Sequence, residues 1–466
     1  MDLVRALRLD DPRCIAFVGA GGKTTAMFQL ARQLPPPVIL TTTTHIATWQ
    51  VNFADRHYQV NMDSDIDQIV GERLSGVILL TGPESEIKRL SGLKKRHLEQ
   101  VYKFARSTQI PLLIEADGSR QRAVKAPDVH EPVIPNFVDV VVVVAGLSAL
   151  DKPLNEQWVH RPLRYAHISG LSIGEQITSS SLASVLKHPE GGMKDIPSDT
   201  RIVALLNQAD TQILQAKGKS IAHQLLPVFQ SVLITSLNFP SRETGRQQNI
   251  VEHSQEGFDR SGSEVFAVIE RVAGIVLAAG GSIRMGQPKQ LLMWRNKTFI
   301  EQVISIAKES GLFPIVVVSG AYSDQIKKVI EPISVQIVNN KHWKGGQSTS
   351  LLMGLEALPP DIGAAVFLLV DQPQIKPRLI QKMIEAHAGT LAPIVSPLID
   401  GQRGNPVLFD QVTFPELLSL QGDTGGRALF SRYETHWVKW LDTDMLYDVD
   451  TQEDYQRLIG SEDDNK

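Results

Sequence analysis

The stretch Gly274-Ile-Val-Leu-Ala-Ala-Gly-Gly-Ser-Ile-Arg-Met-Gly-Gln-Pro-Lys289 decides how the second half of the chain folds. Its apolar residues 275–279 have the length of a buried parallel strand, and Gly280-Gly281 follows where the backbone must approach something closely. A loop of free N–H groups favours anions. Arg284 and Lys289 add two positive charges after the turn, where the phosphates of a nucleotide collect negative charge as a phosphate bond breaks. The stretch therefore predicts a strand followed by a phosphate-binding loop.

Strands and helices are expected to alternate through the rest of this half. Residues 298–309 repeat apolar side chains at helical spacing, and 314–318, 335–338 and 365–370 are short apolar runs. The alternation predicts a mostly parallel, three-layer α/β domain of Rossmann-like type. Ligands of such sheets bind beyond the carboxyl ends of the strands, so residues that directly follow strands are the candidates for chemistry.

Two aspartates are candidate Mg²⁺ ligands. Asp371 directly follows the apolar run 365–370, where a carboxylate can bind a metal that bridges nucleotide phosphates. Asp450 is preferred over Asp448 as the second ligand, because it stands just before the last predicted helix. A strand-ending Asp-x-Pro turn is the alternative for Asp371, and a helix N-cap is the alternative for Asp450.

The pattern Leu-Ala-Ala-Gly-x-x-x-Arg-Met-Gly-x-x-Lys, which begins at Leu277, resembles the signature loop of the MobA-like nucleotidyltransferases. Its Ala-Ala-Gly form is similar to the cytidylyltransferase branch of that family. The resemblance implies CTP as a substrate and catalytic roles for Arg284, Lys289 and Asp371. It also implies nucleotide binding by Leu277, Ala278, Ala279, Gly280, Gly281, Lys289, Asn340 and Ser348.

Two later segments resemble the acceptor-side motifs of molybdenum cofactor cytidylyltransferases. They are Arg403-Gly-Asn-Pro406 and Gly422-Asp-Thr-Gly-Gly-Arg427, with Gly426 at a position that more often holds alanine. Arg403, Asn405 and Arg427 are therefore the expected acceptor-binding residues, since arginine suits a phosphate-bearing acceptor. Solvated surface charge is the alternative for the two arginines.

The first half of the chain contains a different glycine loop. The apolar run 14–18 leads into Gly19-Ala-Gly-Gly-Lys-Thr-Thr25 and then into a helical pattern. Phe17 stands where the full Walker A pattern has its first glycine, so the loop is a shortened variant. Nucleotide binding is expected from Gly19, Gly21, Gly22, Lys23, Thr24 and Thr25. Lys23 would reach the terminal phosphates, and Thr24 would bind Mg²⁺.

A metal-holding acid is expected at a neighbouring strand end. Glu115 and Asp117 follow the apolar residues 112–114 and resemble a Walker B strand. Asn207-Gln-Ala-Asp210 is similar to the base-binding motif of GTPases, although Gln208 replaces the usual lysine. Asn207 and Asp210 are therefore candidate base contacts, and ATP or GTP is the expected nucleotide.

These motifs, with the segments 41–45, 115–120, 125–127 and 130–135, resemble the putative selenium-dependent hydroxylase accessory protein family, often called YqeC-like. The resemblance covers roughly residues 1–240. It implies nucleotide binding and a place in molybdenum hydroxylase maturation, with a hydroxylase apoenzyme as a candidate partner.

Composition sets the remaining limits. The chain has 466 residues, which favours two domains, and these are predicted as 1–262, with a polar linker from about 236, and 263–466. The net charge of -4 and the lack of interleaved basic and aromatic residues argue against nucleic acid as a partner. The single cysteine, Cys14, excludes an intramolecular disulfide. No apolar stretch is long enough for a membrane span, and the start lacks a signal-peptide core, so a cytoplasmic protein is expected.

The sequence thus predicts a two-domain enzyme that transfers CMP from CTP to a molybdopterin-type cofactor. Two alternatives remain open. One is the same chemistry on a sugar phosphate or methylerythritol phosphate, and the other is a nucleotide-gated chaperone for the cofactor.

Overall fold

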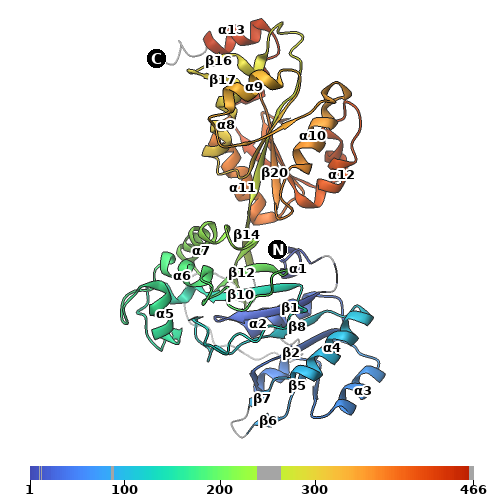
Figure 1. Cartoon of the computed structure of the whole chain (residues 1–466), viewed down its shortest axis with the longest axis vertical. Coiled ribbons are helices and arrows are strands. Elements are labelled where there is room, and N and C mark those ends of the chain that lie inside the picture. Colours follow the sequence, from blue (N-terminus) through green and yellow to red (C-terminus); the bar gives the residue numbers. More distant parts are fainter. Residues whose placement is uncertain (10, 12, 86–88, 239–263, 461–466) are drawn as a thin grey trace, which may run out of the picture. The chain divides into compact units, whose positions relative to one another are not determined.

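The computed structural model describes residues 1–9, 11, 13–85, 89–238 and 264–460. The chain forms two compact units, Met1–Ile269 and Glu270–Lys466 (Figure 1). The predicted domain boundary at 262/263 and most of the predicted linker lie outside the described residues. Strand β14 (Glu264–Glu270), which follows this gap, belongs to the sheet of the first unit.

The first unit is built on a nine-stranded sheet with the order β14-β13-β12-β10-β1-β8-β2-β5-β4. From β13 to β4 the strands pair in parallel. Every residue of β10 is buried, because its run of valines leaves no polar face. The remaining bounds are β13 (Ser231–Ser236), β12 (Arg201–Asn207), β10 (Val140–Gly146), β1 (Cys14–Gly19), β8 (Leu112–Glu115), β2 (Val38–Thr42), β5 (Val77–Thr81) and β4 (Arg56–Gln59).

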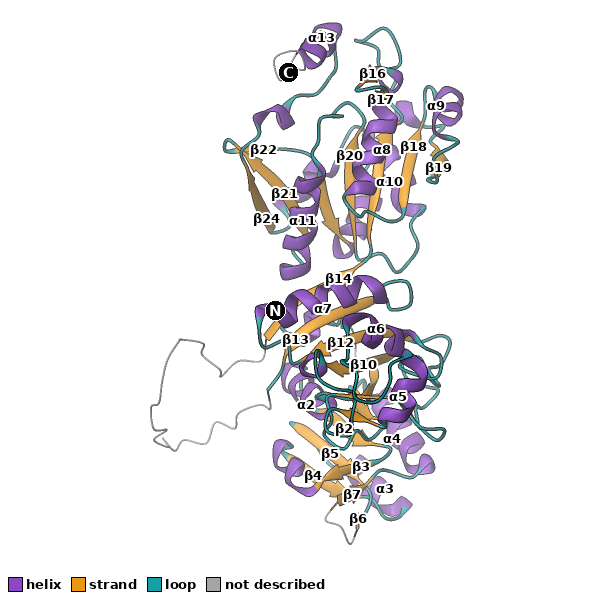
Figure 2. Cartoon of the chain, turned by 90° about the vertical axis from the view of Figure 1, so that its left-hand side faces the viewer, coloured by secondary structure: helices purple, strands orange, loops and turns teal. Residues whose placement is uncertain are grey.

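Helices and two small sheets complete the first unit, and in Figure 2 helices lie on both sides of its strands. The small sheets carry residues that line the candidate site described below. Their strands are β3 (His45–Ala47), β7 (Arg89–Ser91) and β6 (Glu84–Ser85) in one, and β9 (Val124–Lys125) with β11 (Val159–His160) in the other. The helices are α1 (Leu3–Ala6), α2 (Lys23–Gln33), α3 (Asp63–Gly71), α4 (Lys95–Thr108), α5 (Pro162–Ser169), α6 (Ser179–Lys187) and α7 (Gln212–Leu225).

The second unit has the predicted mostly parallel sheet. Strands β19, β18, β15 and β20 are parallel neighbours, and β23 then runs antiparallel to both β20 and β21. Strand β21 therefore ends at the same edge of the sheet as β20, and β24 runs parallel beside it. The strand bounds are β15 (Val272–Ala278), β18 (Ile315–Ser319), β19 (Gln336–Asn339), β20 (Ala364–Leu369), β21 (Ile394–Ile399), β22 (Gln402–Arg403), β23 (Val407–Asp410) and β24 (Thr435–Trp440), with a separate hairpin of β16 (Met293–Trp294) and β17 (Lys297–Thr298).

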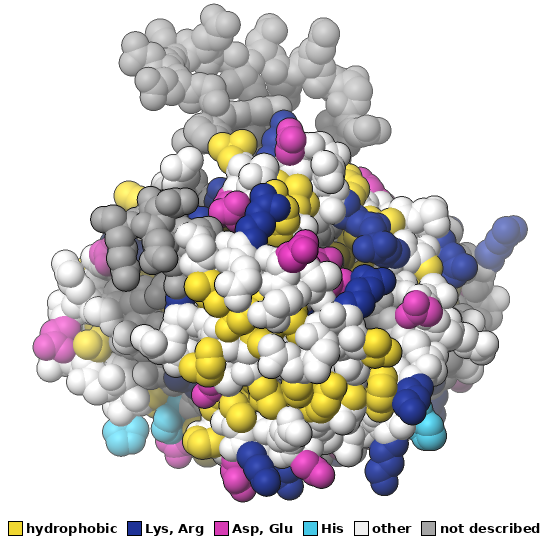
Figure 3. Space-filling model, turned by 90° about the horizontal axis from the view of Figure 1, so that it is seen from above, with side chains coloured by type: hydrophobic (Ala, Val, Ile, Leu, Met, Phe, Trp, Pro, Cys, Tyr) yellow, Lys and Arg dark blue, Asp and Glu magenta, His cyan; other side chains and the backbone are white. Residues whose placement is uncertain are grey.

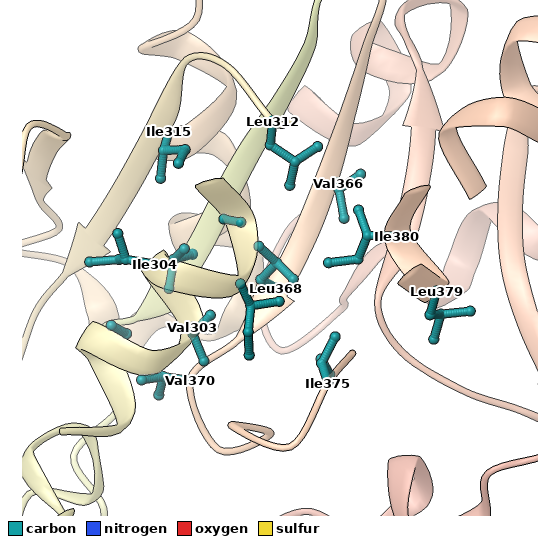
Figure 4. Packing of buried hydrophobic residues seen from close by; sticks show 14 of the residues in the cluster. Val303, Ile304, Leu312, Ile315, Val366, Leu368, Val370, Ile375, Leu379 and Ile380 are labelled. Carbon is teal, nitrogen blue, oxygen red and sulfur yellow. The ribbon is translucent and has the colours of Figure 1, made fainter. Parts of the chain in front are cut away.

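Side-chain alternation along β15 produces the three layers. Val276 packs in one apolar cluster with Val303 of α8 and Ile380 of α11, and Ile275 packs in a second cluster with Leu351 of α10. Figure 4 shows Val303 and Ile380 in the first cluster. Successive side chains of a strand point to opposite faces, so the two clusters cover the two faces of one sheet. The helix bounds are α8 (Phe299–Glu309), α9 (Ser323–Ile330), α10 (Gln347–Glu356), α11 (Pro377–Thr390), α12 (Phe414–Leu418) and α13 (Gln452–Gly460).

Among the described residues, no helix combines the length and the apolar character that crossing a bilayer requires.

Candidate functional sites

The glycine loop of the second unit begins directly after β15, and two side chains donate hydrogen bonds to its carbonyl oxygens. Gln290 is fully buried, and its amide nitrogen donates to the carbonyl oxygens of Ala278 (3.1 Å) and Gly280 (2.8 Å). The Tyr322 hydroxyl donates to the carbonyl of Gly281 at 3.0 Å. A Cβ added at Gly280 would meet no protein atom within 4 Å, whereas one at Gly281 would lie 3.0 Å from the Trp343 ring. Gly280 therefore faces open space, and Gly281 makes room for Trp343.

Lys289 brings the two predicted metal-binding aspartates together. Its Nζ lies 2.5 Å from Oδ2 of Asp371, which follows β20, and 3.0 Å from Oδ1 of Asp450, which precedes α13. The other oxygen of Asp450 lies 3.3 Å from Arg284, whose side chain is 78% exposed. Figure 3 shows Lys and Arg side chains beside Asp and Glu side chains on the end of this unit that carries α13. All four residues thus lie in one cluster at the carboxyl edge of the sheet.

The cluster fits a divalent cation. Oδ1 of Asp371 is buried and lacks a hydrogen-bond partner among the described residues. Burial lowers the pKa of Lys289, but the charges and hydrogen bonds of Asp371 and Asp450 outweigh burial and raise it above its usual value. Two carboxylates that hold one ammonium group between them are also oxygen ligands of the kind Mg²⁺ takes together with phosphates. The described residues contain no group of three or more acids, histidines or cysteines that would hold a metal alone.

Asp448 has a different environment from Asp450. It accepts a hydrogen bond of 2.6 Å from the amide of Gln372, and the structure gives it no direct contact with Lys289. The contact with Lys289 thus distinguishes Asp450 from Asp448, and the choice of Asp450 as the metal ligand stays a prediction.

The two acceptor-side arginines lie close enough for their charges to interact. Burial lowers the pKa of Arg403, and the positive charge of Arg427 lowers it further. The Arg403 guanidinium lies 4.4 Å from the centre of the Phe430 ring, a cation–π arrangement. Arg403 is on β22, directly after the carboxyl end of β21, and thus at the same edge of the sheet as Asp371. Two like charges near each other at this edge favour an anionic ligand. Asn405, expected beside them, is half-buried.

Asn340 and Ser348, two of the predicted nucleotide contacts, bond to neighbouring segments of the protein. Asn340 is buried and donates to the hydroxyls of Thr349 (2.8 Å) and Ser350 (3.0 Å), while its oxygen accepts from the N–H of His342. Ser348 is also buried, and its hydroxyl donates to the carbonyl of Gly422 at 2.6 Å. Both side chains connect the loop before α10 to neighbouring segments. Direct contact of either side chain with a nucleotide stays a prediction, and the burial of both side chains argues against it.

In the first unit, the glycines of residues 19–25 allow the loop to pack tightly. A Cβ at Gly19 would lie 2.2 Å from the carbonyl oxygen of Val144, and one at Gly21 would lie 2.3 Å from the nitrogen of Gly146. The N–H groups of Gly19 and Gly21 already bond to Asp117 and to the carbonyl of Arg122. Helix α2 begins after Gly22 without a side-chain cap, so the first-turn N–H groups from Lys23 onward are the ones available to an anion.

Two acids of the Walker B-like strand have different partners. The Thr24 hydroxyl donates to Oε2 of Glu115 at 2.6 Å, the pairing expected of a phosphate-loop threonine and a metal-holding acid. Burial raises the pKa of Glu115. Asp117 is 1% exposed, and its oxygens contact the Gly19 N–H, Lys23 (3.2 Å) and Lys125 (2.8 Å). A metal would have to displace two ammonium groups from Asp117, so the geometry favours Glu115 as the ligand.

The side chains of the candidate base-binding motif form hydrogen bonds with other residues of the protein. Asn207 is buried and donates to the carbonyl of Gly21 at 2.9 Å, while its oxygen accepts from the Thr235 hydroxyl and the Leu237 N–H. Asp210 accepts a hydrogen bond from Ser236. Neither Asn207 nor Asp210 lines the cavity described next, whereas Gln208 does. Base contact by Asn207 and Asp210 therefore stays a prediction.

The loop opens into a cavity of about 550 Å³. This is within the size range of small-molecule sites. Its wall includes residues to which the sequence alone gave no individual role, because they come from distant segments and, except for Arg120, lie outside the quoted motifs. They are Trp49, Arg89, Arg120, Arg122, His160 and Arg161. Glu131 also lines the cavity, where it bonds to Lys125 (2.7 Å) and Arg161 (2.8 Å). Burial raises the pKa of Glu131, but these bonds outweigh burial and lower it to about 2.

Comparison with known proteins assigns a family to each unit. A model of the YqeC protein family matches residues 15–163, and a model of the MobA-like NTP transferase domain matches residues 274–437. The uncharacterized protein YqeC of Escherichia coli is 31% identical over 214 residues, which is 44% of this chain and 81% of that protein.

Two further relatives each match less than half of the chain. Nicotine blue oxidoreductase of Paenarthrobacter nicotinovorans is 30% identical over 200 residues, covering 40% of this chain and 96% of that protein. A probable molybdenum cofactor guanylyltransferase of Bacillus mycoides is 31% identical over 137 residues, covering 29% of this chain and 66% of that protein.

Proposed function

Because the chain belongs to the YqeC family in its first unit and to the MobA-like NTP transferase family in its second, we propose that it is a molybdenum cofactor cytidylyltransferase with a nucleotide-binding accessory unit. The observation that carries this proposal is the Lys289 ammonium between Asp371 and Asp450 at the carboxyl edge of the sheet. A similarity to a molybdenum cofactor guanylyltransferase supports the acceptor class.

In the proposed reaction, an oxygen of the acceptor phosphate attacks the α-phosphorus of CTP. The bond between that phosphorus and the oxygen that bridges to the β-phosphate breaks, and pyrophosphate leaves with the electron pair. The acceptor phosphate is already a nucleophile, so no side chain has to remove a proton. Positioning and charge neutralisation then supply the rate enhancement.

Each residue of the cluster has a defined task in this reaction. Lys289 and Arg284 neutralise the charge that develops on the leaving pyrophosphate. Asp371 and Asp450 would hold Mg²⁺, which neutralises and orients the phosphates when it is bound. Arg403 and Arg427 would bind the acceptor phosphate, since a guanidinium presents paired donors to phosphate oxygens.

The preference for CTP over GTP rests on Ala278-Ala279-Gly280. The methyl group at position 279, where the guanylyltransferase branch tends to have glycine, narrows the loop and favours the smaller base. The relatives include a guanylyltransferase, which makes the nucleotide the main point to test.

The decisive experiment incubates the protein with Mg²⁺, molybdenum cofactor and each nucleoside triphosphate in turn, and identifies the dinucleotide by mass. CTP is expected to give the cytosine dinucleotide and pyrophosphate. Equal or better use of GTP would overturn the CTP assignment. Transfer only to a sugar phosphate or methylerythritol phosphate would replace the acceptor, and binding of cofactor without any transfer would favour the chaperone alternative.

For the first unit, we propose binding of ATP or GTP with Mg²⁺ at Lys23, Thr24 and Glu115. The Thr24–Glu115 hydrogen bond and the uncapped start of α2 support this assignment. We further propose an accessory role toward a molybdenum hydroxylase apoenzyme, which rests on the sequence resemblance alone.

A further inference from the structure

The cavity of the first unit has an excess of positive charge. Five cationic side chains line it, against the two carboxylates of Glu115 and Glu131. Two of the five already have acidic partners. Lys23 contacts Asp117 and Glu115, and Arg161 is bonded to Glu131 and lies 3.2 Å from Asp128.

The other three cations have no acidic partner among the residues that the structure describes. Arg89, Arg120 and Arg122 line the same cavity, and none of them forms an ion pair with any residue that the structure describes. We call these three residues the arginine wall. An arginine is always charged at neutral pH, so three unpaired guanidinium groups around one cavity repel one another unless an anion lies between them.

The wall is assembled from two separate segments. Arg89 is on β7 of the three-stranded sheet, whereas Arg120 and Arg122 are in the loop between β8 and β9. Arg120 and the following Gln121 both have left-handed backbones, with φ of 48° and 59°. Non-glycine residues in that region cost of order 1–3 kcal/mol each and persist where the surroundings impose them. The Arg122 carbonyl accepts the Gly21 N–H at 3.0 Å, which fixes this loop against the phosphate loop.

The pKa of a neighbouring histidine responds to these positive charges. Burial lowers the pKa of His160, and the charges of Arg161 and Lys125 lower it further, to about 4. Arg120 acts in the same direction. The indole of Trp49 lines the same cavity and is 47% exposed, so it offers an aromatic surface beside the guanidinium groups.

We propose that the arginine wall is a second ligand subsite of the first unit, which binds a small molecule with a phosphate group and an aromatic ring while a nucleotide occupies the phosphate loop. This inference rests on the proposed nucleotide site of that unit. The phosphate loop has its own cation, hydroxyl and helix start for the nucleotide, and the wall supplies three further cations. A unit with two such subsites is equipped to bring two substrates together, whereas a simple nucleotide hydrolase has no use for the second.

Phenyl phosphate is a suitable probe, because it carries only the two recognised groups. Its binding to the full chain is measured by calorimetry with and without a saturating, non-hydrolysable ATP analogue and Mg²⁺. The paired variant Arg120→Gln/Arg122→Gln removes two cations of the wall. Arg96→Gln is the matched control, because Arg96 is 70% exposed and pairs with Asp63 outside the cavity.

Phenyl phosphate is expected to bind in the presence of the analogue. The paired variant should weaken this binding at least ~10-fold, since hydrogen bonds to charged groups are among the stronger ones, while Arg96→Gln leaves it unchanged. Lys23→Ala should weaken the analogue and retain phenyl phosphate.

Three results would overturn the proposal. The first is competitive displacement of phenyl phosphate by the analogue, which would assign the wall to the nucleotide itself. The second is binding of phenyl phosphate by a folded paired variant with the wild-type affinity. The third is no binding of phenyl phosphate to the wild-type protein at millimolar concentration. If the analogue fails to bind at all, the nucleotide site is wrong. The wall is then still tested by phenyl phosphate alone, where loss in the paired variant supports it and retention contradicts it.

Discussion

At the scale of single residues, Lys289 is the side chain on which the second unit's cluster depends. Its ammonium contacts two carboxylates that are far apart in the sequence, and its pKa is raised, so it remains charged at neutral pH. An ammonium held in this way is positioned before substrate arrives. Preorganised charge of this kind is the larger part of catalysis in reactions where negative charge moves onto a leaving group.

Asp371 and Asp450 are predicted to act through one ion. Asp371→Asn should lower the transfer rate by at least ~10²-fold, the scale of losing one preorganised electrostatic partner, and Asp450→Asn should act likewise. The double variant should lose much less than the product of the two effects, because both residues serve the same cation. Steady-state transfer at saturating Mg²⁺ measures this. Asp324→Asn, an exposed first-turn residue of α9, is the control. Multiplicative losses would show that the two aspartates do not share a metal.

At the scale of elements, the two glycine loops use glycine for different reasons. The loop of residues 19–25 needs glycine because its backbone packs against β10, and three of its glycines have positive φ. The loop after β15 has Gly280 at ordinary φ with open space before it. In the proposed nucleotide site, glycine there would serve the ligand rather than the fold.

Gly280→Ala is therefore expected to separate function from stability. No protein atom opposes the new methyl group, so the thermal unfolding temperature should stay at the wild-type value, while kcat/KM for transfer falls at least ~10-fold because the nucleotide is displaced. Gly281→Ala should instead destabilise the unit by pressing on Trp343, and adding Trp343→Ala should relieve that strain. Wild-type kcat/KM in Gly280→Ala would mean that no ligand approaches this glycine.

The small β9–β11 sheet links the stability of the first unit to pH. It pairs His160 with Lys125, and burial together with the charges of Arg161 and Lys125 lowers the pKa of His160 from 6.5 to about 4. The unfolded chain binds a proton at His160 below about pH 6.5, and the folded chain does so only near pH 4, so stability is lost as pH falls between these values.

His160→Gln should remove this loss. When the pH is lowered from 7 to 5, the free energy of unfolding of the variant is expected to rise by about 1 kcal/mol relative to that of the wild type. This figure is reduced to allow for the partial exposure of the His160 side chain. Chemical denaturation of the first unit at both pH values measures the difference. His130→Gln, an exposed histidine of the same unit, should show no such pH dependence. An equal change in both variants would rule out His160 as the linked group.

At the scale of the whole molecule, the chain combines two units with unrelated phosphate loops and separate sheets. Each unit contains its own glycine loop, lysine and carboxylates, which we propose to form two separate nucleotide sites. Lys23→Ala is therefore expected to abolish nucleotide binding by the first unit and to leave the second unit's transfer rate unchanged within about twofold, as for independent sites. Nucleotide binding and transfer are measured on the same full-length preparation. Loss of transfer in a folded Lys23→Ala protein would show that the two sites are strongly coupled.

The sequence by itself determined the local structure and the family of each unit. Buried strands such as β10 and β15 follow from apolar runs, the phosphate loops from glycine, and the mostly parallel sheet of the second unit from alternation of strands and helices. Parallel strands end at a common edge, so the sequence also predicted that Asp371 and Asp450 would meet near the Gly280 loop. These features depend on residues close together in the chain.

Only the tertiary structure decided what each polar side chain contacts. In the structure Asp117 contacts two lysines, and Asn207 and Asn340 form hydrogen bonds that connect separate segments. Arg89 lines the same cavity as Arg120 and Arg122. A local pattern cannot supply this information, because the order of strands in a sheet and the folding of loops over its edge set such contacts. Whether a buried polar group meets a ligand or another protein group is settled by those long-range neighbours.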